Sequence, residues 1–263
     1  MMNRPAGNSS SLHPDCAWLV ERYIAHRGFH TSSAECPENS LSSFERAVRR
    51  GFAIELDVQQ LADGNIVVFH DESTLRMTGV DLSIARCDSN RVRSMRLGGG
   101  DQRIPLIDEV MDLVRGEVPL LIELKNAGSP GNPEKALLGK IRAYEGSCAV
   151  QSFNPRSLRW FRAAAPDLPR WQLSGRLDDL GLPLHKKLPV RYLLTNPLCR
   201  PLFIGYDVTC LPTRRTTTLR DRGMPLLGWT VRSAEEYRRV GHLVDNIIFE
   251  GFDPLDMPAH DSA

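Results

Sequence analysis

Carboxylates at the ends of two apolar runs have the spacing that a metal site requires. Glu55 and Asp57 lie two residues apart at the end of one run, and Glu123 lies at the end of another. Because alternate residues of a strand point to the same face, Glu55 and Asp57 share one side of their strand. Carboxylates held this close repel one another unless a cation neutralises them. Their hard oxygen ligands predict one divalent cation, Mg²⁺ or Ca²⁺, rather than zinc.

Two histidines accompany these carboxylates. His26 ends an apolar run, and His70 ends a second run that follows the dipeptide Asp63-Gly64. Asp-Gly is a favoured two-residue turn of β-hairpins, so we expect an antiparallel pair in which His70 lies directly opposite Asp57. Both imidazoles can titrate near neutral pH. Two histidines beside a metal site can therefore serve as general base and general acid.

Further side chains that could contact a substrate end neighbouring runs. Arg27 and Lys125 supply cationic donors that match phosphate oxygens. Gln151 and Phe153 share one strand face, and Phe153 with Trp229 could form apolar walls around the carbon part of a substrate. Two alternatives stay open: both aromatic rings could belong to the core, and the carboxylates could form a structural ion-pair cluster with Arg27 and Lys125.

The elements that must position these residues follow a simple alternation. Short β-rich runs alternate with helix-like stretches, which predicts parallel strands joined by helices. Eight such units in 263 residues predict one TIM-type (β/α)8 barrel, whose active site lies at the C-terminal ends of the strands. The candidate residues fall at those ends. The expected strands are residues 23–26, 53–58, 119–124, 148–153, 170–173, 203–208, 226–231 and 246–249.

One further run interrupts this alternation and defines the domain organisation. Residues 66–70 follow the second strand too closely for a crossover helix, so we expect a β-hairpin that extends strand 2. Residues of about 72–118 then form a small insertion before strand 3. We expect a flexible leader over residues 1–21, a single domain over 22–254 and a tail over 255–263. The expected helices are residues 41–50, with Ser40 as N-cap, 107–115, 133–144, 156–165 and 234–242.

Composition limits the classes of partner. The net charge of +1 argues against a nucleic-acid-binding surface, and no apolar run approaches the ~18 residues of a transmembrane helix. We therefore expect no nucleic acid and no stable membrane insertion. The six cysteines have neither CxxC nor zinc-site spacing, which favours a reducing, cytoplasmic location. The sequence leaves the oligomeric state open, a homo-oligomer included.

The order and spacing of several motifs resemble the glycerophosphodiester phosphodiesterase family. The resemblance extends over residues of about 23–251. Agreement of so many motifs in order and spacing is not expected by chance. The motifs are HRG at His26, PEN at Glu38, ELD at Glu55, DG followed by HD at His70, IELK at Glu123, VQSFNP at Gln151 and LGWTV at Trp229.

The resemblance implies a TIM-type barrel, one divalent cation and hydrolysis of small-molecule glycerophosphodiesters to glycerol 3-phosphate and an alcohol. It further implies that Glu38 and Asn39 brace the loop that follows the first strand. It assigns the remaining roles as follows: His26 and His70 are the acid–base pair, Glu55, Asp57 and Glu123 hold the metal, and Arg27 and Lys125 hold the phosphate.

Three departures from the family pattern and two competing functions remain. Residues 104–109 read IPLIDE where the family usually has IPTLEE, which touches the insertion rather than the site. Ser40 replaces the threonine that usually follows PEN, and residues 245–250 replace the usual DGIITD, which alters the polar chemistry at the end of the eighth strand. One competing function is a phospholipase D-like enzyme of lysophospholipids or sphingolipids. It needs an apolar membrane-facing loop, which the Arg-rich residues 91–103 do not provide. The other is a non-catalytic phosphodiester-binding barrel, which predicts a missing ligand or histidine, and none is missing.

Overall fold

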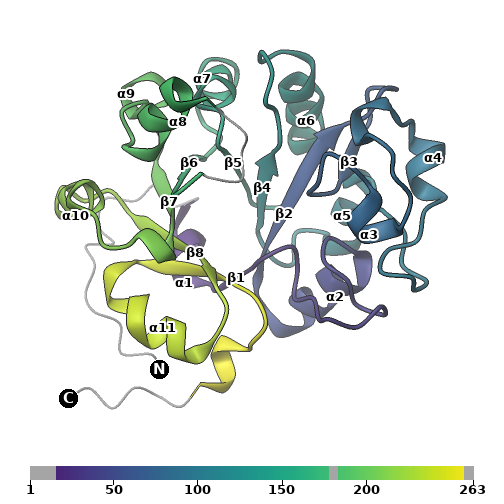
Figure 1. Cartoon of the computed structure of the whole chain (residues 1–263), viewed down its shortest axis with the longest axis horizontal. Coiled ribbons are helices and arrows are strands. Elements are labelled where there is room, and N and C mark those ends of the chain that lie inside the picture. The colour runs from purple at the N-terminus through teal and green to yellow at the C-terminus, as the bar shows by residue number, and fades with distance from the viewer. Residues whose placement is uncertain (1–15, 178–182, 258–263) are drawn as a thin grey trace.

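The computed structural model describes residues 16–177 and 183–257. The eight strands other than β3 run parallel and close into a barrel (Figure 1). Closure occurs because β1 (Ile24–Ala25) pairs with β2 (Ala53–Gln60) on one side and with β9 (Asn246–Phe249) on the other. This is the expected TIM-type fold. The remaining barrel strands are β4 (Leu120–Leu124), β5 (Cys148–Ser152), β6 (Arg170–Ser174), β7 (Phe203–Asp207) and β8 (Leu226–Val231).

Helices surround the strands, and the expected ones begin and end within two residues of their predicted bounds. Ser40 caps α2 as expected, because its Oγ accepts a hydrogen bond from the Ser43 amide at 3.2 Å. Three of the helices between β6 and β8 were not expected: α10 is polar, α8 contains Pro189, and α9 is a single turn. Outside the insertion, the helices that follow the first strand are α2 (Leu41–Arg50), α5 (Ile107–Val114), α6 (Asn132–Ala143), α7 (Pro155–Ala164), α8 (Leu184–Arg191), α9 (Asn196–Cys199), α10 (Arg214–Asp221) and α11 (Ala234–Val240).

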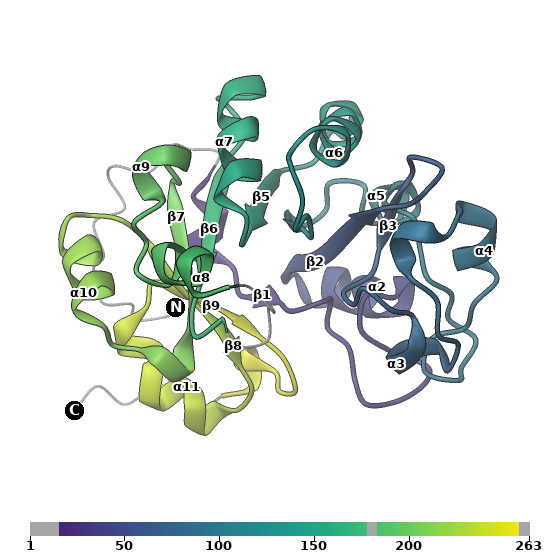
Figure 2. The same ribbon diagram turned by 45° about the horizontal axis from the view of Figure 1, so that its top comes forward.

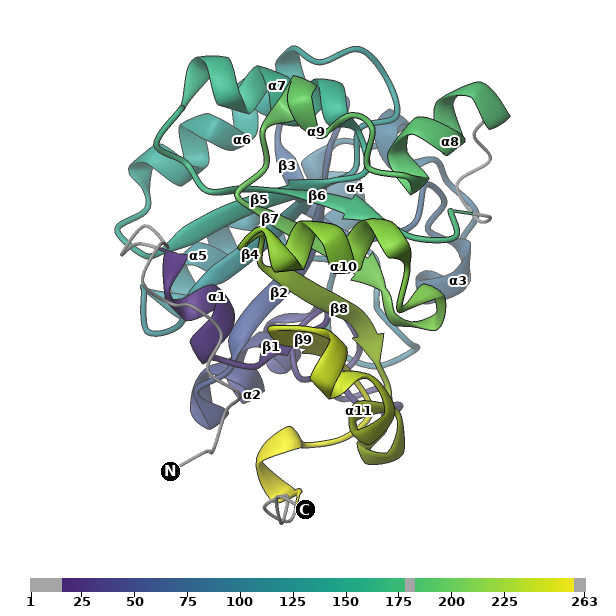
Figure 3. The same cartoon turned by 90° about the vertical axis from the view of Figure 1, so that its left-hand side faces the viewer.

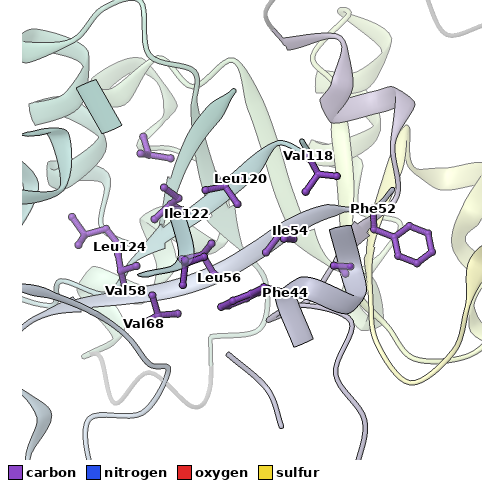
Figure 4. Packing of buried hydrophobic residues seen from close by; sticks show 14 of the residues in the cluster. Phe44, Phe52, Ile54, Leu56, Val58, Val68, Val118, Leu120, Ile122 and Leu124 are labelled. Atoms are coloured by element: carbon purple, nitrogen blue, oxygen red, sulfur yellow. The ribbon is translucent and has the colours of Figure 1, made fainter. Parts of the chain in front are cut away.

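Alternation along the strands separates two apolar layers. Ile54, Leu56 and Ile122 belong to an outer layer that packs between the strands and Phe44 of α2 (Figure 4). Alternate positions along the strands point to the opposite side. The apolar residues at those positions form a separate inner cluster, which includes Ala53, Leu121, Ala149, Trp171 and Leu227. Since Glu55, Asp57 and Glu123 have the same parity as Ala53 and Leu121, they continue the inner rows toward the C-terminal ends of the strands.

A short helix, α1 (Trp18–Glu21), closes the other end of the barrel. Trp18 and Leu19 belong to the same inner cluster as Trp171, and Leu19 is fully buried. Figure 3 shows α1 at the end of the strands opposite the arrowheads. The expected flexible leader over residues 1–21 is therefore too long, because its apolar end packs into the barrel; residues 1–15 lie outside the described residues.

The hairpin forms as expected, but its predicted register is wrong by one residue. β3 (Ile66–Val68) pairs antiparallel with β2, with Val58 opposite Val68. The amide of Phe69 donates to the Asp57 carbonyl at 2.9 Å, so Phe69 rather than His70 lies across from Asp57. The turn is one residue longer than predicted, since the Leu61 amide donates to the Asn65 carbonyl.

The insertion has a small apolar core of its own beside the barrel (Figure 2). It contains α3 (Leu75–Thr78), a 3-10 turn (Ile84–Arg86) and α4 (Ser89–Arg93), after which α5 returns to the barrel. Val67 and Phe69 of the hairpin pack in this core with Ile84, Val92 and Ile104. The hairpin and the insertion therefore form one unit that stands on strand β2.

The end of the described chain is also held in place. Arg50 pairs with Asp253 and Asp256 at the 3-10 turn Pro254–Asp256, and residues 258–263 of the expected tail lie outside the described residues. Within the described ranges, no helix is both long enough and apolar enough to cross a membrane.

Candidate active site

The three predicted metal ligands lie together in the mouth of the barrel. Asp57 of β2 and Glu123 of β4 are direct register partners, and Glu55 precedes Asp57 on the same face. One carboxylate oxygen from each of the three lies within 4.8 Å of one from each of the others. All three side chains are buried. This arrangement offers an oxygen-rich site in which one divalent cation could be held by three side chains.

The charges around these carboxylates shift the pKa of Asp57 and the pKa of Glu55 in opposite directions. Lys125 donates to Glu123 at 2.7 Å and to Asp57 at 3.1 Å, and Arg27 pairs with Asp57 at 3.1 Å. Burial opposes ionisation of Asp57, but the charges of Lys125 and Arg27 outweigh it and hold its pKa well below the usual range. Burial raises the pKa of Glu55, and repulsion from Asp57 and Glu123 raises it further.

The loop after β1 carries Arg27 across the carboxylates. Arg27 and Gly28 both adopt left-handed backbone conformations, with φ of 53° and 80°. The turn places the amide of Arg27 3.1 Å from a carboxylate oxygen of Glu55, to which it donates a hydrogen bond. Glu38 accepts a hydrogen bond from Arg27 at 2.7 Å, and Asn39 donates to Asp57 at 3.0 Å. Glu38 and Asn39 thus contact the site itself as well as the loop.

His26 lies at the junction of the first and last strands of the barrel. Its Nδ1 is 2.5 Å from an Oε2 atom of Glu250, which directly follows β9. Burial and the charge of Arg27 lower the pKa of His26 to about 4, although Glu250 opposes that shift. His26 is therefore a neutral imidazole near neutral pH, able to accept a proton.

His70 reaches the same site although its predicted strand register was wrong. β3 ends at Val68, so His70 lies in the turn that follows the strand. Its charge contributes to lowering the pKa of Asp57, after those of Lys125 and Arg27, and also lowers that of Glu123. Asp71 holds its Nδ1 at 2.6 Å, and Arg76 of α3 links Asp71 to Glu38. The insertion is thereby tied to the loop that carries Arg27.

The remaining predicted residues line the inner wall. Gln151 donates to Glu55 at 2.9 Å, while its Oε1 is buried and has no hydrogen-bond partner among the described residues. Phe153 and Trp229 meet edge to face with ring centroids 5.6 Å apart. Both rings are partly exposed and pack on the inner cluster. They therefore belong to the core and to the mouth of the barrel at once.

Several contacts of the site were not expected from the sequence. Glu250 pairs with His26, and Asp71 pairs with both His70 and Arg76. His30 lies 3.6 Å from Glu250. Glu250 directly follows the last strand, so the rule that places polar residues at strand ends could have marked it as a site residue, although not as the partner of His26. His30 lies four residues after His26 but gives no signal on its own.

The donor set of the site suits a hard divalent cation. Three buried carboxylates converge there, and Mg²⁺ and Ca²⁺ both prefer such oxygen ligands. Asp57 is ionised, while Glu55 and Glu123 have raised pKa values that a bound cation would reverse. The chemistry of these residues therefore fits one cation.

Comparison with known proteins assigns the family. The model of the Glycerophosphoryl diester phosphodiesterase family matches residues 26–252. The glycerophosphodiester phosphodiesterase of Caldanaerobacter subterraneus subsp. tengcongensis is 30% identical over 232 residues, covering 82% of this chain and 88% of that protein. Lysophospholipase D GDPD1 of Homo sapiens is 32% identical over 120 residues, covering 41% of this chain and 37% of that protein.

A solved structure shares the fold. An Oleispira antarctica phosphodiesterase in complex with the product sn-glycerol-3-phosphate has a TM-score of 0.73 at 20% identity, covering 87% of this chain and 92% of that one. The family model spans most of the chain, and the Caldanaerobacter relative aligns over most of its own length. The chain therefore belongs to the glycerophosphoryl diester phosphodiesterase family and is an enzyme that hydrolyses glycerophosphodiesters.

Proposed function

We propose that the chain hydrolyses glycerophosphodiesters to sn-glycerol 3-phosphate and an alcohol, with His26 and His70 as the acid–base pair. One observation carries this proposal: both histidines border the cluster of Glu55, Asp57 and Glu123 in the barrel mouth. The name of the Caldanaerobacter relative and the product bound by the Oleispira structure support the substrate class. The spacing of the cysteines, with no CxxC motif, supports a reducing location such as the cytoplasm.

The proposed roles follow from the contacts of each residue. Glu55, Asp57 and Glu123 hold one Mg²⁺ or Ca²⁺, which supplies positive charge to a phosphate oxygen when bound. Arg27 and Lys125 present cationic donors to the remaining phosphate oxygens. Gln151, which donates a hydrogen bond to Glu55, offers its amide oxygen to the same site. Phe153 and Trp229 form an apolar wall against the carbon face of the glycerol or the alcohol.

Proton transfer falls to the two imidazoles. Nδ1 of His26 and Nδ1 of His70 are each held by a carboxylate, so Nε2 is the atom of each ring that can exchange a proton with substrate. One histidine removes a proton from the nucleophile, water or the glycerol 2-hydroxyl, as its oxygen bonds to phosphorus and the bond to the leaving alcohol breaks. The other donates a proton to the leaving alcohol. Attack by water gives glycerol 3-phosphate directly, whereas attack by the hydroxyl gives a cyclic phosphate that one water then opens to glycerol 3-phosphate. Arg27 and Lys125 stabilise the charge that develops on the phosphate.

A second candidate function is release of the head group from lysophospholipids. The human relative is named a lysophospholipase D, and α8 exposes Leu184 and Leu188 with Tyr192 directly after it. Figure 3 shows α8 at the end of the barrel toward which the strands point, where the site lies. An exposed apolar stripe beside the mouth could contact an acyl chain. Activity on lysophosphatidylcholine above that on glycerophosphocholine would favour this candidate.

The test measures glycerol 3-phosphate released from glycerophosphocholine with Mg²⁺, with Ca²⁺ and with EDTA. His26→Ala and His70→Ala should each lower kcat by roughly 10²–10⁴-fold, the usual contribution of an acid–base group. His242→Ala, remote from the site, is the matched control and should retain activity. Near-normal turnover of both site variants, or full activity in EDTA, would overturn the proposal.

A further inference from the structure

We propose that Glu250 is a positioning residue that fixes the tautomer and the orientation of His26. The inference rests on the proposed function, in which His26 transfers a proton. Glu250 is the last residue of the segment 245–250, whose sequence differs from the usual family sequence. Glu250 touches His26 but none of the carboxylates of the metal cluster in the contacts of the described residues.

The closure of the barrel places the two residues side by side. Ala25 of β1 and Phe249 of β9 are register partners, so His26 and Glu250 directly follow a paired position. The backbone fixes both: the His26 amide donates to the Phe249 carbonyl at 2.9 Å, and the Glu250 amide donates to the Val231 carbonyl at 3.0 Å. The side-chain contact is therefore built on rigid strand ends.

Hydrogen-bond chemistry then determines the tautomer of His26. An ionised carboxylate can only accept hydrogen bonds, so the proton between Glu250 and Nδ1 of His26 must belong to the imidazole. In the neutral ring, Nε2 then carries the lone pair. This is the form that a general base requires, and the protonated ring donates from the same Nε2 atom as a general acid. Glu250 therefore serves either role of His26.

Glu250 is itself held in place by two further side chains. Arg232 donates to Oε1 at 2.8 Å, which leaves Oε2 for His26, and His30 lies 3.6 Å from Oε2. Burial opposes ionisation of Glu250, but these partners lower its pKa and keep it charged. His26, His30 and Glu250 also lie close enough together to hold a metal ion. The positive charges of the nearby Arg232 and Arg27 weigh against such a second metal site, because they would repel a bound cation.

The first test is a double-mutant cycle on kcat. Glu250→Ala should lower kcat by roughly tenfold to a hundredfold with little change in KM, a smaller loss than that of His26→Ala. In the His26→Ala background, Glu250→Ala should have no further effect, because its partner is gone. Equal losses of kcat in both backgrounds would overturn the inference.

Asp245 provides a matched control in the same part of the barrel. It directly precedes β9 and pairs with Arg220 at 3.1 Å, with a side chain as exposed as that of Glu250. Asp245→Ala removes a carboxylate ion pair at the other end of the strand. It should lower the melting temperature without lowering kcat below the melting transition. A kcat loss equal to that of Glu250→Ala would assign the effect to general damage of β9.

The second test reads the imidazole itself in the metal-free protein. Nitrogen-15 NMR of wild-type His26 should show the proton on Nδ1, and Glu250→Gln should give a mixture of tautomers. Glu250 raises the pKa of His26, whereas Arg27 lowers it and Arg232, His30 and Asp57 act on the same network. Removing the charge of Glu250 should therefore lower the pH at which the His26 imidazole titrates in the same NMR spectra. An unchanged tautomer together with an unchanged His26 titration in Glu250→Gln would overturn the inference.

The kcat values of the variants distinguish a failure of the proposed role of His26 from a failure of the role of Glu250. If His26→Ala is fully active, the proposed function of His26 fails, whatever Glu250 does. If His26→Ala is inactive and Glu250→Ala resembles wild type, only the role of Glu250 fails. Partial recovery of kcat in Glu250→Asp, relative to Glu250→Ala, would support a carboxylate that acts through the imidazole.

Discussion

The three clustered carboxylates cannot all be ionised at equal cost. Asp57 is surrounded by Lys125, Arg27 and Asn39, and these partners keep it charged despite its burial. Glu55 has a peptide amide and the Gln151 amide as partners, and its pKa is raised by burial and then by the charges of its two carboxylate neighbours. Unequal partners thus hold the pKa of Asp57 well below its usual range and leave the pKa values of Glu55 and Glu123 raised, a shift that a bound cation would oppose.

We predict that divalent metal stabilises the protein more strongly at higher pH. A glutamate whose folded pKa is raised contributes stability at low pH and loses it as the pH rises from its unfolded value of about 4.3 through its folded pKa. Bound metal replaces that proton, so the gain is largest where the carboxylates must be ionised. The rise in melting temperature on adding Mg²⁺ or Ca²⁺ should be greater near ~pH 8 than near ~pH 5.

Glu123→Gln is the control for this prediction. The variant keeps the shape of the ligand but removes one negative charge, so the metal-free protein should be no less stable and the metal-induced rise should shrink. A metal-induced rise that is independent of pH, or that persists in Glu123→Gln, would contradict a carboxylate-held cation.

The loop after β1 shows how one element positions several site residues. Gly28 has a φ of 80°, and a Cβ there would lie 2.4 Å from Ser43 Oγ and 2.9 Å from Phe44 Cδ1. The loop can therefore lie against the start of α2 only because residue 28 has no side chain. That close approach determines where Arg27 meets Glu55 and Asp57.

Gly28→Ala should therefore damage both stability and activity, whereas Gly64→Ala should damage stability alone. Both residues have a left-handed backbone, which costs a non-glycine residue about 1–2 kcal/mol. Only Gly28 adds a clash, since a Cβ at Gly64 meets nothing within 4 Å. Chemical denaturation and kcat of both variants test this. Equal kcat values in the two variants would show that the loop does not position the site.

The elements also show which features of the molecule a sequence can predict. Spacing of two residues within a strand correctly placed Glu55 with Asp57, because strand geometry is local. The register of the hairpin was wrong because the turn depends on a remote contact: Ser89 of the insertion donates to Asp63 through its amide at 2.8 Å and its hydroxyl at 2.6 Å. The partner of His26 was missed because it depends on pairing between the first and last strands.

At the scale of the whole molecule, the two ends of the barrel have different tasks. The C-terminal ends of the strands carry the charged site, while α1 covers the N-terminal ends with Trp18 and Leu19. Gly205 makes room for the inner layer between them, because a Cβ there would lie 2.2 Å from the Trp171 ring. The inner cluster thus forms an apolar floor beneath the site.

Loss of this cover should therefore cost stability without changing the chemistry. Leu19 is fully buried in the inner cluster, so Leu19→Ala removes buried methyl groups and should lower the free energy of unfolding by roughly 2–5 kcal/mol. Leu255→Ala, at a side chain that is 47% exposed, is the control and should change stability by less than about 0.5 kcal/mol. Urea denaturation measures both. Since the site lies at the opposite end of the strands, kcat of Leu19→Ala should equal that of wild type below its melting transition. A large loss of kcat in a folded Leu19→Ala protein would show instead that the floor of the barrel is coupled to the carboxylates at its mouth.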